Sequence, residues 1–315
     1  MPSTKKASGT QADKFRDLAG IVLKHHFGNR AANITPKSGG LSNFVFEGKH
    51  AEGDFIVRIS PDPARLNQFI KEQWCERAAR RAGIPTAEIL ETGGSVIPFP
   101  YAVSRSVGGT EGTDHPERSK IIAELGRYAK KINSIRTRGF GETFDWSNNE
   151  LSRNKTLKEY LEGEYQCEAR IETLERSGLS SPATVKSVRR IVREMLSIKT
   201  LPVLNHGDLR LKNVIADDAG KITAIIDWEK ATSNVAPQWE FSVALHDLGV
   251  DGQEQFVKGY GMPPKRLAEV APYVKAFNLL NYTDKINEAI ARKDKATLAQ
   301  FRMRFSGAFD MYSFA

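Results

Sequence analysis

The periodicity of hydrophobic residues changes once along the chain, and this change limits the possible folds more than any other feature. Before residue 105, short β-branched stretches such as Phe55–Ile59 alternate with turn signals. After a Gly-rich stretch at 107–112, apolar residues recur at helical spacing, as in Ile121, Ile122 and Leu125. A sheet-rich segment followed by a helical one is typical of an α+β protein with two lobes.

The first lobe is predicted to span residues 1–107 and to hold a small, mostly antiparallel sheet with one main helix. Residues 1–10 are polar and are expected to be disordered. The second lobe is predicted over 108–315. It is larger and mostly helical, with a polar, β-like island at 203–229.

Composition excludes several classes of protein. With 40% apolar and 27% charged residues, the chain of 315 residues is neither a disordered tail nor a disulfide-framed module. No apolar run reaches the ~18 residues of a membrane helix, and the start of the chain lacks a signal segment. We therefore expect a cytoplasmic protein without a membrane partner. Its two cysteines form no CxxC pair, which argues against a thiolate zinc site.

The net charge is +8, but the basic residues are spread out along the chain. A solvated basic surface therefore explains the charge better than a nucleic-acid partner does.

The strongest chemical signal is the segment 204–213, Leu-Asn-His-Gly-Asp-Leu-Arg-Leu-Lys-Asn, followed by Asp227. A hairpin between them would bring the chain back to where the hairpin began, so Asp227 is expected near Asp208 and Asn213. Two carboxylates and an amide, with no His or Cys ligand, suit Mg²⁺ better than zinc.

The spacing also matches a phosphoryl-transfer template, in which an Asp receives the hydroxyl proton while an Asn five positions later and a second Asp hold the metal. Asp208 could instead cap a turn, but its combination with Asn213 and Asp227 favours catalysis. By spacing, Arg210 could reach the transferring phosphoryl group as a cation. His206 is interpreted as a structural residue that orders the loop.

His-Gly-Asp-Leu-x-x-x-Asn followed by Ile-Ile-Asp-Trp-Glu resembles the aminoglycoside phosphotransferase and choline kinase superfamily. Weaker matches follow in the family order over residues 35–250, at Gly39–Asn43, at Arg58, at Glu72 before Gly83-Ile84-Pro85, and at 100–109. The resemblance implies a bilobal protein-kinase-like fold. It also implies a small-molecule kinase that uses ATP or GTP with Mg²⁺.

By this resemblance, Asp208 is the catalytic base, and Asn213 and Asp227 hold Mg²⁺. Arg58 contacts the α- and β-phosphates and pairs with Glu72. The predicted nucleotide contacts are Ser42, Asn43, Arg58, Glu72, Ser104, Arg105, Ser106 and Val107. Two departures stand out: Arg replaces the commoner Lys at position 58, and Leu211-Lys212 replaces Pro-Gly in the loop.

The acceptor is expected on the lobe after residue 110. Residues 214–260 carry eight acidic and three basic positions, a local charge of −5 that would attract a cationic acceptor. The predicted acceptor contacts are Glu229, Glu240, Asp247 and Trp239. These carboxylates fit solvated helix faces equally well, and Trp239 fits the core as well as a substrate wall.

The function predicted from the sequence is Mg²⁺-dependent transfer of the γ-phosphoryl group of ATP or GTP to a hydroxyl of a small molecule, such as an aminoglycoside-like antibiotic or an amino alcohol. The alternative is a nucleotide-binding regulator without turnover. A protein kinase is disfavoured because the full Gly-rich loop and the A-P-E segment are missing. A monomer and a homodimer are both compatible with the sequence.

Overall fold

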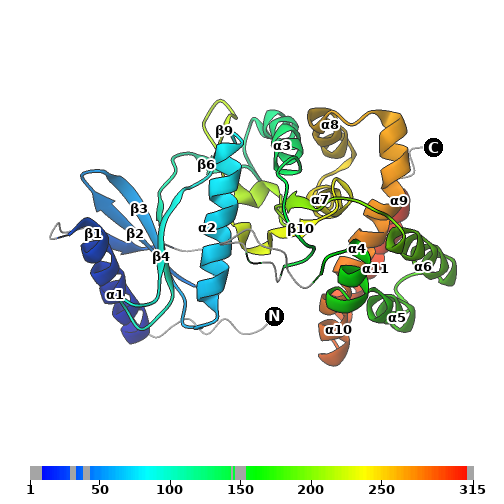
Figure 1. Ribbon diagram of the computed structural model, residues 1–315, viewed down its shortest axis with the longest axis horizontal. Coiled ribbons are helices and arrows are strands. Elements are labelled where there is room, and N and C mark those ends of the chain that lie inside the picture. The colour runs from blue at the N-terminus through cyan, green and yellow to red at the C-terminus, as the bar shows by residue number, and fades with distance from the viewer. Residues whose placement is uncertain (1–8, 29–32, 38–42, 143–144, 146–153, 311–315) are drawn as a thin grey trace. The chain divides into compact units, whose positions relative to one another are not determined.

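The computed structural model describes residues 9–28, 33–37, 43–142, 145 and 154–310, with side chains from 11 to 305 within those ranges (Figure 1). The chain forms two compact units, Met1–Gly109 with Thr223–Glu229, and Thr110–Ile222 with Lys230–Ala315. The sequence predicts a single break after residue 107. The structure differs in that a short later segment, 223–229, joins the first unit.

The first unit is built on an antiparallel sheet of five strands in the order β1-β2-β3-β5-β4. Helix α1 begins at Gly9, so this part of the segment expected to be disordered is helical, while residues 1–8 lie outside the described residues. The elements are α1 (Gly9–Phe27), β1 (Asn33–Pro36), β2 (Phe44–His50), β3 (Gly53–Ile59), α2 (Arg65–Arg81), β4 (Ile89–Gly93) and β5 (Tyr101–Arg105).

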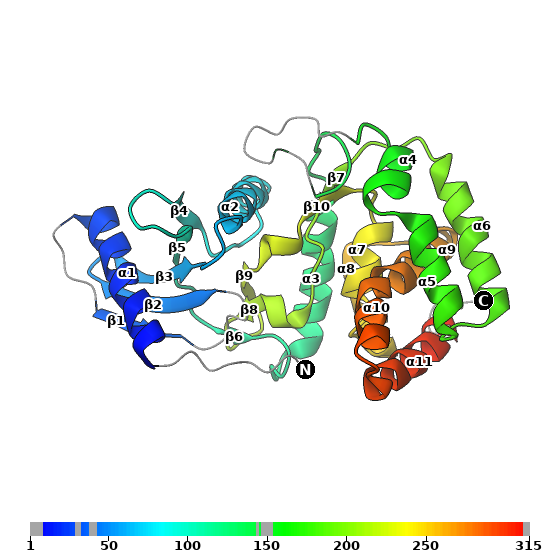
Figure 2. The same ribbon diagram turned by 90° about the horizontal axis from the view of Figure 1, so that it is seen from below.

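The two helices of this unit cover opposite faces of the sheet (Figure 2). Phe55, Val57 and Ile59 alternate along β3 and pack with the buried residues of α1, so they line one face. Ala102, on the other face of β5, packs with Phe69 of α2. Because Arg58 lies between Val57 and Ile59, its side chain leaves β3 toward the α2 face.

Strand β9 (Ile222–Ile225) leads the later segment into the first unit. Ile225 forms a parallel bridge with Thr86, and its amide donates to the carbonyl of Pro85 at 2.9 Å. This contact fixes the segment that carries Asp227 next to the chain that leaves α2.

The second unit is mostly helical, with short strand pairs at its loops. Strand β7 pairs with β10, and β6 pairs with β8, both antiparallel. The elements are β6 (Thr110–Glu111), α3 (Arg118–Ile132), α4 (Leu157–Glu159), the π-helical turn η1 (Tyr160–Glu164), α5 (Cys167–Ser177), α6 (Pro182–Leu196), β7 (Val203–Asn205), η2 (Leu211–Asn213), β8 (Val214–Ala216), β10 (Thr232–Asn234), α7 (Gln238–Ala244), α8 (Val250–Tyr260), α9 (Pro264–Asn281), α10 (Thr283–Ala291) and α11 (Lys295–Asp310). A short 3₁₀ turn, Trp228–Lys230, crosses the division between the units in sequence. Among the described residues, no helix combines the length and hydrophobicity needed to cross a membrane.

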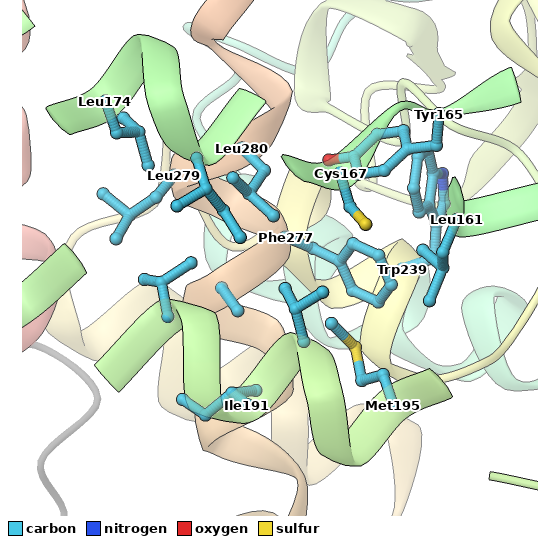
Figure 3. Packing of buried hydrophobic residues seen from close by; sticks show 14 of the residues in the cluster. Leu161, Tyr165, Cys167, Leu174, Ile191, Met195, Trp239, Phe277, Leu279 and Leu280 are labelled. Carbon is cyan, nitrogen blue, oxygen red and sulfur yellow. The ribbon is translucent and has the colours of Figure 1, made fainter. Parts of the chain in front are cut away.

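The core of the second unit lies between α5, α6 and α9 (Figure 3). Helix α6 shows why its sequence is helical. Pro182 stands at the start, Ser181 caps the amide of Thr184 at 3.1 Å, and residues 185, 188, 191, 192 and 195 form a buried stripe. Phe277 and Trp239 pack edge to face in the same core, with ring centroids 5.1 Å apart.

Apolar residues at helical spacing predict one long helix over 153–177, but the structure interrupts it. Thr156 and Glu159 form a capping box that starts α4, the chain widens into η1, and Gln166 then adopts a left-handed conformation with φ 54° before α5 begins. The hydrophobic periodicity continues across this break, which explains why the sequence reads as one helix.

Helices α3 and α8 approach so closely that each needs a glycine. A Cβ at Gly126 would lie 2.1 Å from the carbonyl oxygen of Phe256, and one at Gly259 would lie 2.0 Å from that of Ala123. Neither gap holds a methyl group, because the obstructing atoms belong to the backbone.

We expect Gly126→Ala to lower the free energy of unfolding by about 1–3 kcal/mol, because α8 must move away from α3. Gly163→Ala is the matched control, because a Cβ at that position would meet no atom of the described residues within 4 Å. The control should be neutral or slightly stabilising. Urea unfolding followed by circular dichroism measures both, and equal effects would contradict the close helix contact.

Candidate functional site

The loop after β7 is shaped by a glycine that no other residue can replace. Gly207 has φ 73°, and a Cβ there would lie 2.0 Å from the carbonyl oxygen of Lys230. The preceding His206 is fully buried, and its Nδ1 accepts the amide of Asp208 at 3.3 Å. The loop therefore turns sharply and presents Asp208 directly after the turn.

The carboxylate of Glu240, on α7, holds this loop from behind. Its Oε2 accepts the amide of His206 at 2.6 Å, and its Oε1 accepts the amide of Gly207 at 3.3 Å. The side chain is fully buried, and burial raises the pKa of Glu240 to about 7 against the effect of these amides. Glu240 is therefore a positioning residue for the loop.

Asp208 is surrounded by donors from its own loop. Its Oδ1 accepts Nε of Arg210 at 2.5 Å, while its Oδ2 accepts Nζ of Lys212 at 2.9 Å and Nδ2 of Asn213 at 3.0 Å. Burial by itself raises the pKa of Asp208, but Arg210 and Lys212 outweigh burial and lower the pKa below its usual range. The carboxylate is thus ionised and oriented, as a proton acceptor must be.

Asn213 is placed with its amide nitrogen toward Asp208, because Nδ2 also donates to the Asp208 carbonyl at 2.8 Å. Its Oδ1 has no partner among the residues that the structure describes, so this oxygen can face a cation. The donor set fits Mg²⁺, which takes oxygen ligands and keeps few protein ligands. Within the described ranges, no group of three or more His, Cys, Asp or Glu residues forms a metal site.

In the first unit, Arg58 of β3 forms a buried ion pair with Glu72 of α2, with 2.8 Å between Nη1 and Oε2. Burial lowers the pKa of Arg58, but the nearby carboxylate of Glu72 outweighs it and leaves the pKa raised. Burial raises the pKa of Glu72, and Arg58 opposes that rise. The ring of Phe69 lies 5.2 Å from the guanidinium and supports it through a cation–π contact.

Asp227 follows β9 in the same unit and adopts φ 65°, an uncommon conformation for a residue other than glycine. Its charge acts on both Arg58 and Glu72, so these three side chains share one electrostatic environment. Glu229, two residues later, pairs with Arg65 of α2 at 3.2 Å. Strain at a charged residue is typical of functional sites.

The other predicted nucleotide contacts are at the strand ends of the first unit. Asn43 precedes β2, and its buried Oδ1 has no partner within the described part of the chain; Ser42 lies outside the described residues. The amides of Arg105 and Ser106 donate to the carbonyls of Glu88 and Asp54. A nucleotide base would therefore need other backbone groups of Ser104–Val107, the segment that ends β5.

The structure places the four predicted acceptor contacts in different surroundings. Trp239 is 7% exposed and belongs to the core of the second unit, while Glu240 is fully buried behind the loop. Neither side chain is exposed, and their contact with an acceptor stays a prediction. Asp247 is half-exposed and pairs with Nη1 of Arg210 at 2.8 Å, and Glu229 lies in the first unit.

Asp227 belongs to the first unit, and Asp208 and Asn213 belong to the second. Their expected meeting therefore stays a prediction. Lys212 was not predicted as a partner of Asp208, although its spacing of four residues was a usable signal.

A second glutamate of α2, Glu76, is buried near the Arg58–Glu72 pair and accepts the amide of Ile89 at 2.8 Å. Burial raises the pKa of Glu76 to about 7, with the Ile89 amide and Arg58 acting against burial. In the unfolded chain the carboxyl ionises near its ordinary pKa of 4.5. The folded pKa is the higher one, so the stability that Glu76 contributes falls as pH rises from about 4.5 to about 7.

We expect Glu76→Gln, which keeps an oxygen for the Ile89 amide, to gain about 2–3 kcal/mol of unfolding free energy relative to the unmodified protein between about pH 4.5 and pH 8. Urea titrations across this range measure the difference. Asp17→Asn, on an exposed position of α1, is the control. A difference that does not change with pH would contradict burial of an ionisable Glu76.

Several solved structures of other proteins resemble this one over almost their whole length. Aminoglycoside phosphotransferase APH(4)-Ia is 18% identical with a TM-score of 0.69, covering 96% of this chain and 99% of that chain. A thermostable mutant of it in complex with ADP and hygromycin B is 19% identical, with a TM-score of 0.68 and coverage of 94% and 99%. APH(2")-IIia with GDP and kanamycin is 14% identical, with a TM-score of 0.64 and coverage of 91% and 97%.

These similarities establish the kinase-like fold expected from the sequence, an antiparallel sheet with a larger helical part. No curated protein sequence matches the chain significantly. The sequence model of the phosphotransferase enzyme family, however, matches residues 33–269, which include Arg58, Glu72, Asp208, Asn213 and Asp227. The chain therefore belongs to the phosphotransferase enzyme family, as a nucleotide-dependent kinase of small molecules with a hydroxyl group as acceptor.

Proposed function

We propose that the protein transfers the γ-phosphoryl group of ATP or GTP to a hydroxyl of a small molecule, with Asp208 as the base. The observation that carries this proposal is the environment of Asp208, whose carboxylate is ionised, oriented by its own loop and held from behind by Glu240. If Asp208 only capped a turn, its carboxylate would not need three donors and a buried glutamate behind the loop.

In the proposed reaction, Asp208 accepts the proton of the acceptor hydroxyl as its oxygen attacks the γ-phosphorus. The bond between that phosphorus and the β–γ bridging oxygen breaks, and ADP or GDP leaves. Most of the rate enhancement comes from positioning and from cations near the developing charge. Arg210 and Lys212 are suited to stabilise the developing negative charge, because both cations contact Asp208.

Arg58 is proposed to contact the α- and β-phosphates. Its ion pair with Glu72 uses Nη1, so the other N–H groups of the guanidinium can donate to phosphate oxygens. A guanidinium binds two such oxygens at once. The neighbouring structures in complex with ADP and GDP support a nucleotide donor of either type. The choice between ATP and GTP is part of the test.

Asn213 of the second unit and Asp227 of the first are each proposed as a ligand of Mg²⁺. When bound, this ion would neutralise charge on the phosphates. The support is the oxygen chemistry of both side chains, the orientation of the Asn213 amide and the strained backbone of Asp227.

The alternative, a nucleotide-binding regulator without turnover, is less well supported because the base and both proposed metal ligands are present. Hygromycin B and kanamycin, bound in the neighbouring structures, are hydroxylated small molecules and support an acceptor of that general type.

We expect Asp208→Asn to reduce acceptor-dependent ADP or GDP release by at least about a hundredfold, the usual contribution of a general base. Nucleotide binding should be unchanged, because the replacement is isosteric. A coupled assay with Mg-ATP and Mg-GTP measures release over a panel of hydroxylated acceptors.

Asp218→Asn, at an exposed position shortly after the same loop, is the matched control and should retain full turnover. Undiminished turnover in Asp208→Asn would refute the mechanism. Nucleotide binding without turnover on any acceptor would favour the regulator.

We expect Arg58→Met to weaken ADP binding by about tenfold or more, because charge-assisted hydrogen bonds to the phosphates are lost. Arg58→Lys should bind more tightly than Arg58→Met, because it keeps the charge. Arg77→Gln, exposed on α2, controls for the loss of a cation. Isothermal titration with ADP measures all three, and equal affinities would exclude a phosphate contact by Arg58.

A further inference from the structure

A chain of contacts leads from Asp208 across the surface of the second unit. Arg210 joins Asp208 to Asp247, and Oδ1 of Asp247 lies 4.0 Å from Nε2 of His246. The same Nε2 lies 3.0 Å from Nη1 of Arg304, on α11. Helix α11 is far from Asp208 in sequence, yet its Arg304 belongs to the surroundings of this carboxylate.

Tyr282, between α9 and α10, lies in the middle of this group. Its ring packs between His246, with centroids 4.7 Å apart, and Phe301, at 5.5 Å. The charges of Asp247, Arg304, Arg210 and Asp208 all act on its hydroxyl. In the described ranges this hydroxyl has no hydrogen-bond partner, so it can donate to a ligand near Asp208.

Cations outnumber carboxylates around this hydroxyl and the base, within the residues that the structure describes. Arg210 and Lys212 pair with Asp208, and Arg210 also pairs with Asp247. Two further cations, Lys285 and Arg304, contact Tyr282 and His246. Nζ of Lys285 lies 5.9 Å from the ring centroid of Tyr282. The surface on which an acceptor meets Asp208 therefore carries more positive than negative charge. The sequence segment 214–260, which supplies Asp247, is by contrast acidic.

Two of these cations, Arg304 and Lys285, differ from the others in their partners. Arg304 is exposed and contacts His246, and burial lowers the pKa of His246 to about 4, so this histidine is neutral near pH 7. In the part of the chain that the structure describes, neither Arg304 nor Lys285 forms an ion pair with Asp or Glu. Asp284, the neighbour of Lys285, pairs instead with Arg170 at 2.8 Å.

We propose that the acceptor carries an anionic group, a carboxylate or a phosphate, in addition to its hydroxyl, and that Arg304 and Lys285 bind this group beside Tyr282. The proposal rests on the proposed function, since it takes Asp208 as the base. A guanidinium and an ammonium on one surface are the usual recognition elements for such anions. A polycationic acceptor would meet repulsion here, because its ammonium groups would face these two cations.

The test compares one hexose skeleton in four charge states. The probes are glucuronate, glucose 6-phosphate, glucose and glucosamine, with kanamycin as a polycation. Binding is measured by the rise in Tm with probe concentration, in the presence of saturating ADP so that the phosphate-binding groups of the first unit are occupied. The variants are Arg304→Gln, which removes the charge, Arg304→Lys, which keeps it, and Arg302→Gln, at an exposed neighbouring position of α11, as the control.

We expect glucuronate, glucose 6-phosphate or both to bind, and Arg304→Gln to weaken this binding by about tenfold. Arg304→Lys should restore part of it, and Arg302→Gln should leave it unchanged. Binding of glucuronate alone identifies a carboxylate site, and binding of glucose 6-phosphate alone identifies a phosphate site. In turnover assays, Arg304→Gln should raise KM for an anionic acceptor more than it lowers kcat.

Four results would overturn the proposal: no binding by either anion, equal binding by glucose, tighter binding by glucosamine or kanamycin, or equal loss in Arg304→Gln and Arg302→Gln. ADP binding, measured in the same samples, shows whether only the anion site or also the proposed function has failed. If ADP binds and Asp208→Asn abolishes turnover while no anion binds, the anion site alone is wrong.

Discussion

The buried carboxylate of Glu240 is the interaction on which the loop 206–213 depends. A loop that turns as sharply as His206-Gly207 leaves two amides pointing inward, and unpaired buried amides are costly. Glu240 satisfies both with one side chain, anchored on α7. The direction of Asp208, and through it the positions of Arg210, Lys212 and Asn213, follows from this anchor because each of these residues bonds to Asp208.

The first unit buries a carboxylate in a different way. Glu72 is 3% exposed and is neutralised by a guanidinium, whereas Glu240 is surrounded by amide donors. The two kinds of partner, a guanidinium for Glu72 and backbone amides for Glu240, suit different roles. Amides hold a loop in place and add no net charge, whereas Arg58 remains a cation that can also contact a ligand. A buried ion pair contributes little to stability by itself, so its value lies in orienting Arg58.

Much of this architecture could be predicted from the sequence, because it is encoded locally. The change from strand to helix periodicity and the spacing of Asp208, Asn213 and Asp227 are all properties of neighbouring residues. The break at Gln166 was missed because hydrophobic spacing continues through it. Strand β1 was missed because it is short and mostly exposed, so it lacks the alternation that reveals a strand.

The role of an acidic residue could not be predicted, because the sequence does not say which partner it meets. Glu240 and Asp247 look alike in the sequence, yet one is buried under two amides and the other pairs with Arg210 on the surface. A local charge of −5 over residues 214–260 therefore does not describe the surface near Asp208.

That surface depends on cations that the fold brings from outside the segment. Arg210 and Lys212 precede it, and Lys285 and Arg304 come from α10 and α11, far along the chain. Electrostatic attraction acts through space and decays within about 10 Å in salt, so the charge that a ligand meets is set by tertiary contacts and not by sequence windows. Acceptor preference in such a kinase therefore has to be derived from the folded surface, residue by residue.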